Sequence, residues 1–101
     1  MSKYENVVII KANLSKHELS EVISKIESKI SEFAKIIQKE DYGIKTLAYE
    51  INENKQGHYF VYQFEVEDDK NKENVLKELE HFYRITDEII RYITVKCEEK
   101  R

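Results

Sequence analysis

The spacing of apolar residues changes along the chain, and each change marks a predicted secondary-structure element. The first run, Tyr4–Lys11, is rich in β-branched residues and predicts a strand. Apolar residues then recur at spacings of three and four, which predicts an amphipathic helix reaching about Glu32. Ser15 and Glu18 precede this stripe with the spacing of a capping box, so the helix is expected to begin at Ser15. The stripe consists of Leu19, Val22, Ile23, Ile26, Ile30 and Phe33.

The middle of the chain is dominated by extended patterns. Residues 35–51 predict a long strand that is interrupted near Gly43. The stretch "NENKQG", residues 52–57, predicts a turn, and His58–Val66 has the clearest strand pattern in the chain. Two long strands joined by a short polar turn are expected to pair as a hairpin.

The last third repeats the helix and strand of the first. Residues 67–74, "EDDKNKEN", predict a solvated loop, with Asp69 or Asn71 as the cap of a second helix. Glu88–Lys96 is β-branched and predicts the final strand. The buried stripe of the second helix is expected to contain Val75, Leu76, Leu79 and Phe82.

The resulting order is βαββαβ, with two similar halves. Right-handed crossovers fold this order into a four-stranded antiparallel sheet with both helices on one face. The sequence therefore predicts an α+β protein of the ferredoxin-like kind. Residues 1–96 are expected to form a single domain, followed by a short tail at 97–101. This fold hosts many functions and does not select among them.

The strands carry more apolar residues than one covered face needs. A sheet covered on one side should alternate apolar and polar residues, but three strands are apolar on both sides. Two helices can cover only one face, so the other face is expected to expose several apolar side chains. Such a surface usually marks a docking site. The residues expected there are Val7, Ile9, Tyr59, Val61, Ile93 and Val95.

Composition narrows the partners of such a binding module. The 101 residues are 41% hydrophobic and 37% charged, which fits a globular domain, and the formal net charge is −3. Proteins that bind polyanions by charge alone are usually strongly basic, so this chain is not of that type. The single cysteine cannot form an internal disulfide. The chain has no apolar run long enough for a signal peptide or a membrane span, which favours the cytosol.

Candidate catalytic and metal-binding residues are weak. The three histidines have no nucleophile that could be assigned to them, and the acidic cluster lacks the glycine and the ligand spacing of a calcium loop. Surface or core histidines and a solvated loop are the better interpretation. We therefore expect no catalytic residue, no metal and no cofactor. The residues considered are His17, His58, His81, Cys97 and the cluster Glu65, Glu67, Asp68 and Asp69.

Two features point more weakly to nucleic acid. The strand "QGHYFVYQF" matches the aromatic strand of RNA-recognition modules at Gly57, Phe60 and Val61 only, and strand packing explains it equally well. Basic residues also lie at strand ends and turns, where a small sheet protein would meet a phosphate backbone. These are Lys3, Lys11, Lys45, Lys55, Arg84, Arg91 and Lys96.

Four stretches resemble one known family. "GIKTLAYEI", residues 43–51, resembles the signature of the ribosomal protein S6 family of the bacterial small subunit: a glycine, an apolar residue, a basic residue, then Leu-Ala/Ser-Tyr-x-Ile. "KYENVVII", "NKQGHYFVYQF" and "YRITDEIIRYITVK" resemble its first strand, its hairpin with the third strand, and its closing segment. The similarity runs in order from about Lys3 to Lys96. Thr46 and Glu50 depart from the residues common in the family.

The resemblance implies a ferredoxin-like fold and a structural, non-enzymatic role. It implies binding to the central domain of small-subunit rRNA together with ribosomal protein S18, a small basic protein that would supply positive charge and cover the open face. By the resemblance, Lys45, Arg84 and Arg91 are the first candidates for phosphate contacts, followed by Lys3, Lys55 and Lys96. Leu47, Tyr49 and the six open-face residues named above would contact the protein partner.

A second class of function is weighed against this one. An effector-binding or acylphosphatase-like domain can have the same fold. An acylphosphatase-like site would need an arginine in a glycine-rich loop after the first strand. The stretch there, "KANLSKHE", has neither glycine nor arginine.

Overall fold

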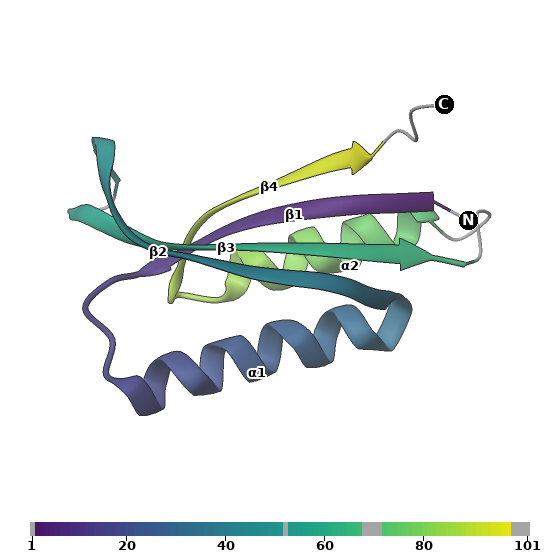
Figure 1. The fold of residues 1–101 in the computed structure, drawn as a ribbon, viewed down its shortest axis with the longest axis horizontal. Helices are drawn as coiled ribbons and strands as arrows, with labels where there is room; N and C mark the ends of the chain where they lie inside the picture. Colours follow the sequence, from purple (N-terminus) through teal and green to yellow (C-terminus); the bar gives the residue numbers. More distant parts are fainter. Residues whose placement is uncertain (1, 52, 68–71, 98–101) are drawn as a thin grey trace.

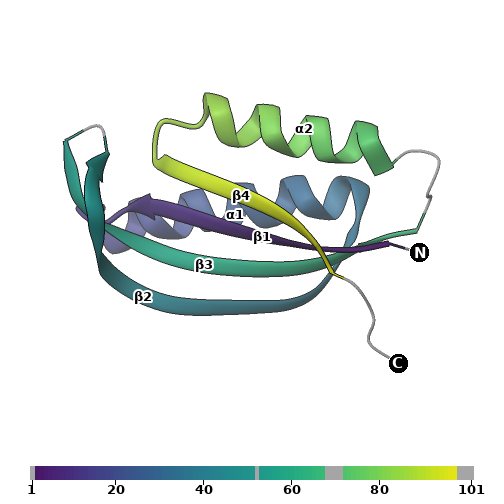
Figure 2. The ribbon, with the colours of Figure 1, turned by 90° about the horizontal axis from the view of Figure 1, so that it is seen from above.

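The structure, a computed structural model, describes residues 2–51, 53–67 and 72–97. Its strands form one four-stranded antiparallel sheet in the order β2-β3-β1-β4. Both helices lie on the same face of the sheet (Figures 1 and 2). This confirms the predicted ferredoxin-like fold. The elements are β1 (Ser2–Lys11), α1 (Lys16–Phe33), β2 (Lys35–Ile51), β3 (Asn54–Val66), α2 (Lys72–Ile85) and β4 (Ile89–Cys97).

The first helix begins and ends where its local sequence indicates. The Ser15 hydroxyl accepts a hydrogen bond from the Glu18 amide at 3.1 Å, and the Ser15 amide donates to the Glu18 carboxylate at 3.0 Å. Two hydrogen bonds with Ser15 lower the pKa of Glu18. The bond from the Ser15 backbone has the larger effect, and the bond with the Ser15 side chain has the smaller one. Val22, Ile26 and Ile30 are buried. The capping box and the amphipathic stripe are both confirmed.

The core lies between the helices and one face of the sheet. Alternate residues of β3 point into it, as the strand pattern predicted. Val75 and Leu79 of α2 are buried, and Leu76 and Phe82 are half-buried. The pattern did not single out Tyr83, whose side chain is only 1% exposed. The buried apolar cluster comprises Tyr4, Val8, Ile10, Val22, Ile26, Ile30, Phe60, Tyr62, Phe64, Val66, Val75, Leu79, Tyr83 and Ile89.

One polar network extends from this core to β4. Asn6, in the middle of β1, is 0% exposed. Its side-chain oxygen accepts a hydrogen bond from the Tyr83 hydroxyl at 2.6 Å, and its amide nitrogen donates to the Thr94 hydroxyl at 2.8 Å. Burial also raises the pKa of Tyr83, which keeps the phenol protonated as a donor. The network therefore joins β1 to both α2 and β4.

One predicted boundary is wrong because strand pairing extends the element. β3 begins at Asn54, not His58, since Gly57 pairs with Lys45 and Gln56 with Thr46 on β2. The polar residues 54–57 therefore continue the ladder that the turn pattern was expected to end. α2 begins at Lys72, so residues 72–74, the last part of the predicted loop, belong to the helix. The predicted helix cap at Asp69 or Asn71 lies outside the described residues.

A bulge interrupts β2 at the predicted place. Asp41 pairs with Phe60 and Gly43 pairs with Tyr59, so Tyr42 is an extra residue on β2. Gly43 has φ of 80°, a conformation that glycine adopts without strain. Beyond the bulge, the end of the β2–β3 hairpin curls away from the plane of the sheet (Figures 1 and 2).

We expect Gly57→Ala to destabilise the protein by about 1–3 kcal/mol. A Cβ atom at Gly57 would overlap Cγ2 of Ile9, and Ile9 is itself 7% exposed and has little room to move. Urea denaturation measures the loss. Ile9→Ala removes the obstructing methyl group, so the double variant should lose less than the sum of the two single variants. Additive losses would show that the overlap is not the cause.

Candidate protein and nucleic-acid interface

The face of the sheet opposite the helices carries an apolar strip. Val7 of β1 lies between Val61 of β3 and Ile93 of β4 in the register of the sheet. We define the apolar strip as Val7, Tyr59, Val61, Ile93 and Val95. Ile93 and Val95 are 51% and 49% exposed, and the other three are half-buried. The structure thus places apolar surface where the excess of apolar strand residues indicated.

Ile9 was expected to be exposed on the open face, but it is only 7% exposed. It lies under the curled end of the β2–β3 hairpin, in a pocket of about 170 Å³ whose walls include Leu47, Tyr49, Tyr59 and Arg91. Leu47 is half-buried, whereas Tyr49 is 84% exposed. The hairpin therefore turns one end of the open face into a shallow pocket with aromatic and cationic walls.

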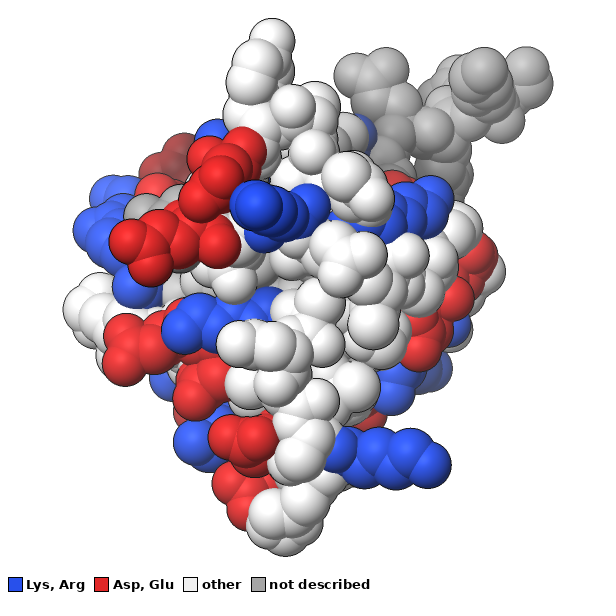
Figure 3. Space-filling model, turned by 90° about the vertical axis from the view of Figure 1, so that its left-hand side faces the viewer, with Lys and Arg blue, Asp and Glu red and all other residues white. Residues whose placement is uncertain are grey.

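Basic groups gather at this end of the molecule. Lys45 and Lys55 lie on the outer part of the hairpin, and Arg91 of β4 lines the pocket; all three are exposed. Figure 3 looks at this end and shows uncharged surface through its middle, with basic side chains set into and beside it and acidic side chains among them. The hairpin end thus places three exposed basic side chains beside a pocket with aromatic and aliphatic walls, although acidic side chains lie at the same end.

The other three basic candidates lie elsewhere. Lys3 and Lys96 are at the opposite end of the sheet, where β1 begins and β4 ends. Arg84 lies in the last turn of α2 and pairs with Glu80 at 3.0 Å. Hydrogen bonds raise the pKa of Arg84, and the bond with Tyr92 contributes more than the bond with Glu80. The six candidates therefore form three separate groups.

Lys45 has neighbours that the sequence pattern did not reveal. Its ammonium nitrogen lies 5.5 Å from the centre of the Tyr42 ring and 5.8 Å from that of Tyr59. Both distances are within the range of cation–π contacts. The sequence did show a tyrosine next to Gly43, where the strand was expected to be interrupted. It did not show that Tyr42 contacts Lys45, because that contact depends on the bulge.

The bulge is held from the helix side of the sheet. One carboxylate oxygen of Asp41 accepts a hydrogen bond from the Gly43 amide at 2.8 Å and lies 2.7 Å from Nε2 of His58. Burial opposes ionisation of Asp41, but the hydrogen bonds from Gly43 and His58 outweigh it and lower the pKa of the carboxyl group. The His58 ring also stacks on Phe60. This histidine therefore has a structural role.

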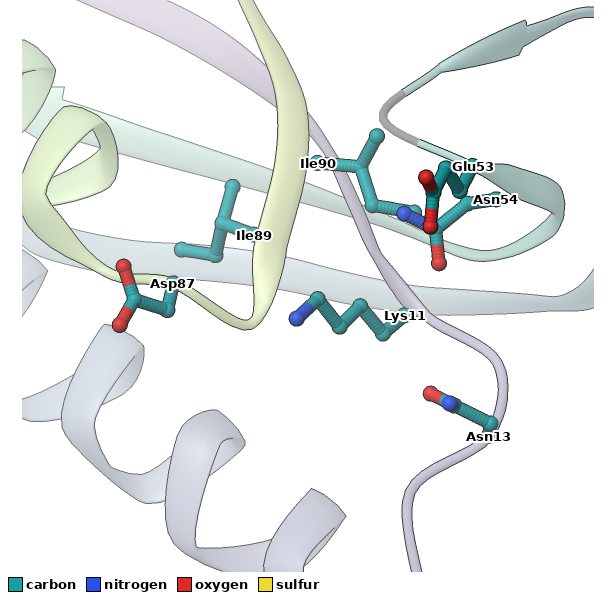
Figure 4. A pocket seen from close by; sticks show the side chains of 7 residues that line it. All are labelled: Lys11, Asn13, Glu53, Asn54, Asp87, Ile89 and Ile90. Atoms are coloured by element: carbon teal, nitrogen blue, oxygen red, sulfur yellow. The ribbon is translucent and has the colours of Figure 1, made fainter.

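A more polar pocket of about 330 Å³ lies beside the end of β1. Lys11 and Asn13 contribute to it from β1 and the following loop, Glu53 from the hairpin turn, and Asp87 from the segment before β4 (Figure 4). The two carboxylates offset the one lysine, so the pocket has no surplus positive charge for a phosphate. The described residues contain no cluster of three metal-ligating side chains. None of the helices in those residues has the length and apolar character to cross a membrane.

A family model and two similar proteins point to one family. The family model described as "Ribosomal protein S6" matches residues 3–96. The small ribosomal subunit protein bS6 of Rickettsia prowazekii is 34% identical over 99 residues, which cover 97% of this chain and 78% of that protein. The bS6 protein of Helicobacter pylori is 33% identical over 102 residues, covering 100% of this chain and 68% of that protein.

A solved structure extends the similarity to three dimensions. The crystal structure of 30S ribosomal protein S6 from Thermotoga maritima superimposes with a TM-score of 0.84 at 34% sequence identity. The match covers 95% of this chain and 87% of that one. The similarity therefore includes the sheet, both helices and the open face.

Proposed function

The chain belongs to the ribosomal protein S6 family, and from this premise we propose that it binds the central domain of small-subunit rRNA jointly with ribosomal protein S18. As a family member it is a structural, non-enzymatic protein of the small subunit and is part of the cytoplasmic ribosome. This assignment replaces the acylphosphatase-like alternative.

The observation that carries the proposed partner is the apolar strip. Half-exposed aliphatic side chains such as Ile93 and Val95 stand on a face that neither helix covers, and a bound protein would remove them from water. S18 is expected to be basic, and this chain has a net charge of −3. Opposite net charges favour their association and leave the heterodimer able to bind RNA. Leu47, Tyr49 and Ile9 extend this proposed interface under the hairpin.

The proposed RNA contacts follow from where the basic groups lie. Arg91 lines the pocket at the hairpin end, Lys45 lies against Tyr59 of the same pocket, and Lys55 is further along the hairpin. We expect these three to contact one stretch of phosphate backbone. Lys3 and Lys96 at the far end of the sheet, and Arg84 on α2, would contact other segments. Arg84 would have to exchange its partner Glu80 for a phosphate.

Sedimentation with small ribosomal subunits tests this proposal. In moderate salt we expect the protein to travel with the subunits, and the double variant Lys45→Gln/Arg91→Gln to be displaced at lower salt than the wild type. Lys25→Gln/Lys77→Gln removes the same charge from exposed positions on the two helices and should behave like the wild type. Recovery of the wild-type protein only in the free fraction would contradict the proposal.

A further inference from the structure

We propose that the bulge at Tyr42 and Gly43 is a positioning device, which holds the Lys45 ammonium group between two tyrosine rings in the place where it meets an RNA phosphate. Tyr42 and Tyr59 are then positioning residues and Lys45 is the contact residue. The inference rests on the proposed function, because that function makes Lys45 a phosphate ligand. The positioning explains how the exposed Lys45 side chain can have a defined position before RNA binds.

The first support is the geometry of the three side chains. Lys45 and Tyr42 come from β2 and Tyr59 comes from β3, and both ring centres lie within 6 Å of the lysine nitrogen, at 5.5 and 5.8 Å. Tyr42 is 51% exposed and Tyr59 is half-buried. A lysine on a strand surface ordinarily samples many rotamers, and two aromatic faces restrict this one.

The bulge is what makes this arrangement possible. Lys45 pairs with Gly57 and Gly43 with Tyr59, so both lie on the open face. Simple alternation along a strand would then turn Tyr42, the neighbour of Gly43, toward the helices. As the extra residue of the bulge, Tyr42 instead reaches Lys45 on the open face.

Both flanks of Tyr42 are fixed. On the helix side, the Asp41 carboxylate bridges the Gly43 amide and His58 and closes the bulge. On the open face, the Tyr42 hydroxyl is hydrogen-bonded to Glu40, and this bond together with the negative charge of Glu40 raises the pKa of Tyr42. The ring is therefore held at its backbone and at its tip, and its face is left for Lys45.

This arrangement changes what binding costs. Ordering a free lysine side chain opposes its contact with a phosphate, and a lysine ordered in advance avoids most of that cost. The two rings cover only part of the ammonium group, so its remaining N–H donors can still reach a phosphate oxygen. At the strength of exposed cation–π contacts, loss of one ring should weaken RNA binding roughly two- to fivefold.

Nuclear magnetic resonance of the free protein tests the positioning itself. Ring currents from two nearby aromatic faces should shift the Lys45 ε-methylene protons upfield of the other lysines. Tyr42→Leu should lose most of this shift, whereas Tyr42→Phe, which keeps the ring and lacks the hydroxyl, should keep most of it. Unshifted Lys45 protons in the wild type would overturn the inference. Because half of Tyr42 is exposed and it lies outside the core, both variants are expected to fold.

Binding of the complex with S18 to the central-domain rRNA separates this inference from the function on which it rests. Tyr42→Leu should lower the affinity roughly two- to fivefold and leave the salt slope unchanged, since the lysine is still present. Lys45→Gln should reduce the slope by about 1. An unchanged slope for Lys45→Gln would overturn the phosphate contact itself. A reduced slope with unshifted Lys45 protons would overturn only the positioning and leave the proposed function standing.

Discussion

Replacing Asn6 by alanine will lower the free energy of unfolding by about 2–4 kcal/mol. The change leaves the Tyr83 hydroxyl, its partner at 2.6 Å, without an acceptor in the core. It also opens a small cavity where a side chain with 0% exposure had been. The tie to Thr94 on β4 is lost as well. Urea denaturation followed by circular dichroism measures the loss.

Two further variants show whether the network is the cause. Tyr83→Phe keeps the ring and leaves Asn6 without its donor, so it should cost about 1–3 kcal/mol. The double variant should lose clearly less than the sum, because each single change already breaks the same hydrogen bond. Thr94→Val removes the acceptor of the Asn6 amide nitrogen but leaves the hydrogen bond from Tyr83 to Asn6 in place, so it should cost less than Asn6→Ala. A loss below about 1 kcal/mol for Asn6→Ala would contradict this account of the core.

Replacing Ile93 by lysine should weaken binding to S18 by about 2 kcal/mol or more, roughly thirtyfold, while the fold stays intact. Ile93 is 51% exposed at the centre of β4, so the change leaves the core untouched. In the complex it would place a charge in an apolar contact and next to a basic partner, and both effects oppose binding. Isothermal titration calorimetry of the two proteins without RNA measures the change.

Ile85→Lys is the matched control. Ile85 is 62% exposed at the end of α2, so the same chemical change is made on the helix side of the protein. It should leave S18 binding within about twofold of the wild type, since it lies outside the proposed interface. Equal losses in both variants would mean that general charge, rather than the apolar strip, governs the association.

Local sequence determines the parts of the fold that the pattern predicted well. The Ser15 and Glu18 hydrogen bonds span three residues, and the stripe from Val22 to Ile30 needs only helical spacing. By contrast, the early start of β3 depends on register with β2, where Gly57 pairs with Lys45. The contact between Asn6 and Tyr83 joins residues 77 positions apart. No local pattern contains such pairings.

The candidate site shows the same division. Excess apolar residues on the strands were enough to locate the apolar strip, because alternation assigns each residue to a face. They did not reveal that Ile9 is covered, which follows from the curl of the hairpin over that end of the sheet. Nor did they show that Tyr42 meets Lys45, since the bulge breaks the alternation from which the faces were assigned.

The joint binding of RNA is tested most directly by one titration. The central domain of small-subunit rRNA is titrated with this protein alone and with its equimolar complex with S18, at several salt concentrations. We expect weak binding by the protein alone, as its net charge of −3 indicates, and tight binding by the complex with a steep dependence on salt. The same affinity with and without S18 would contradict the account.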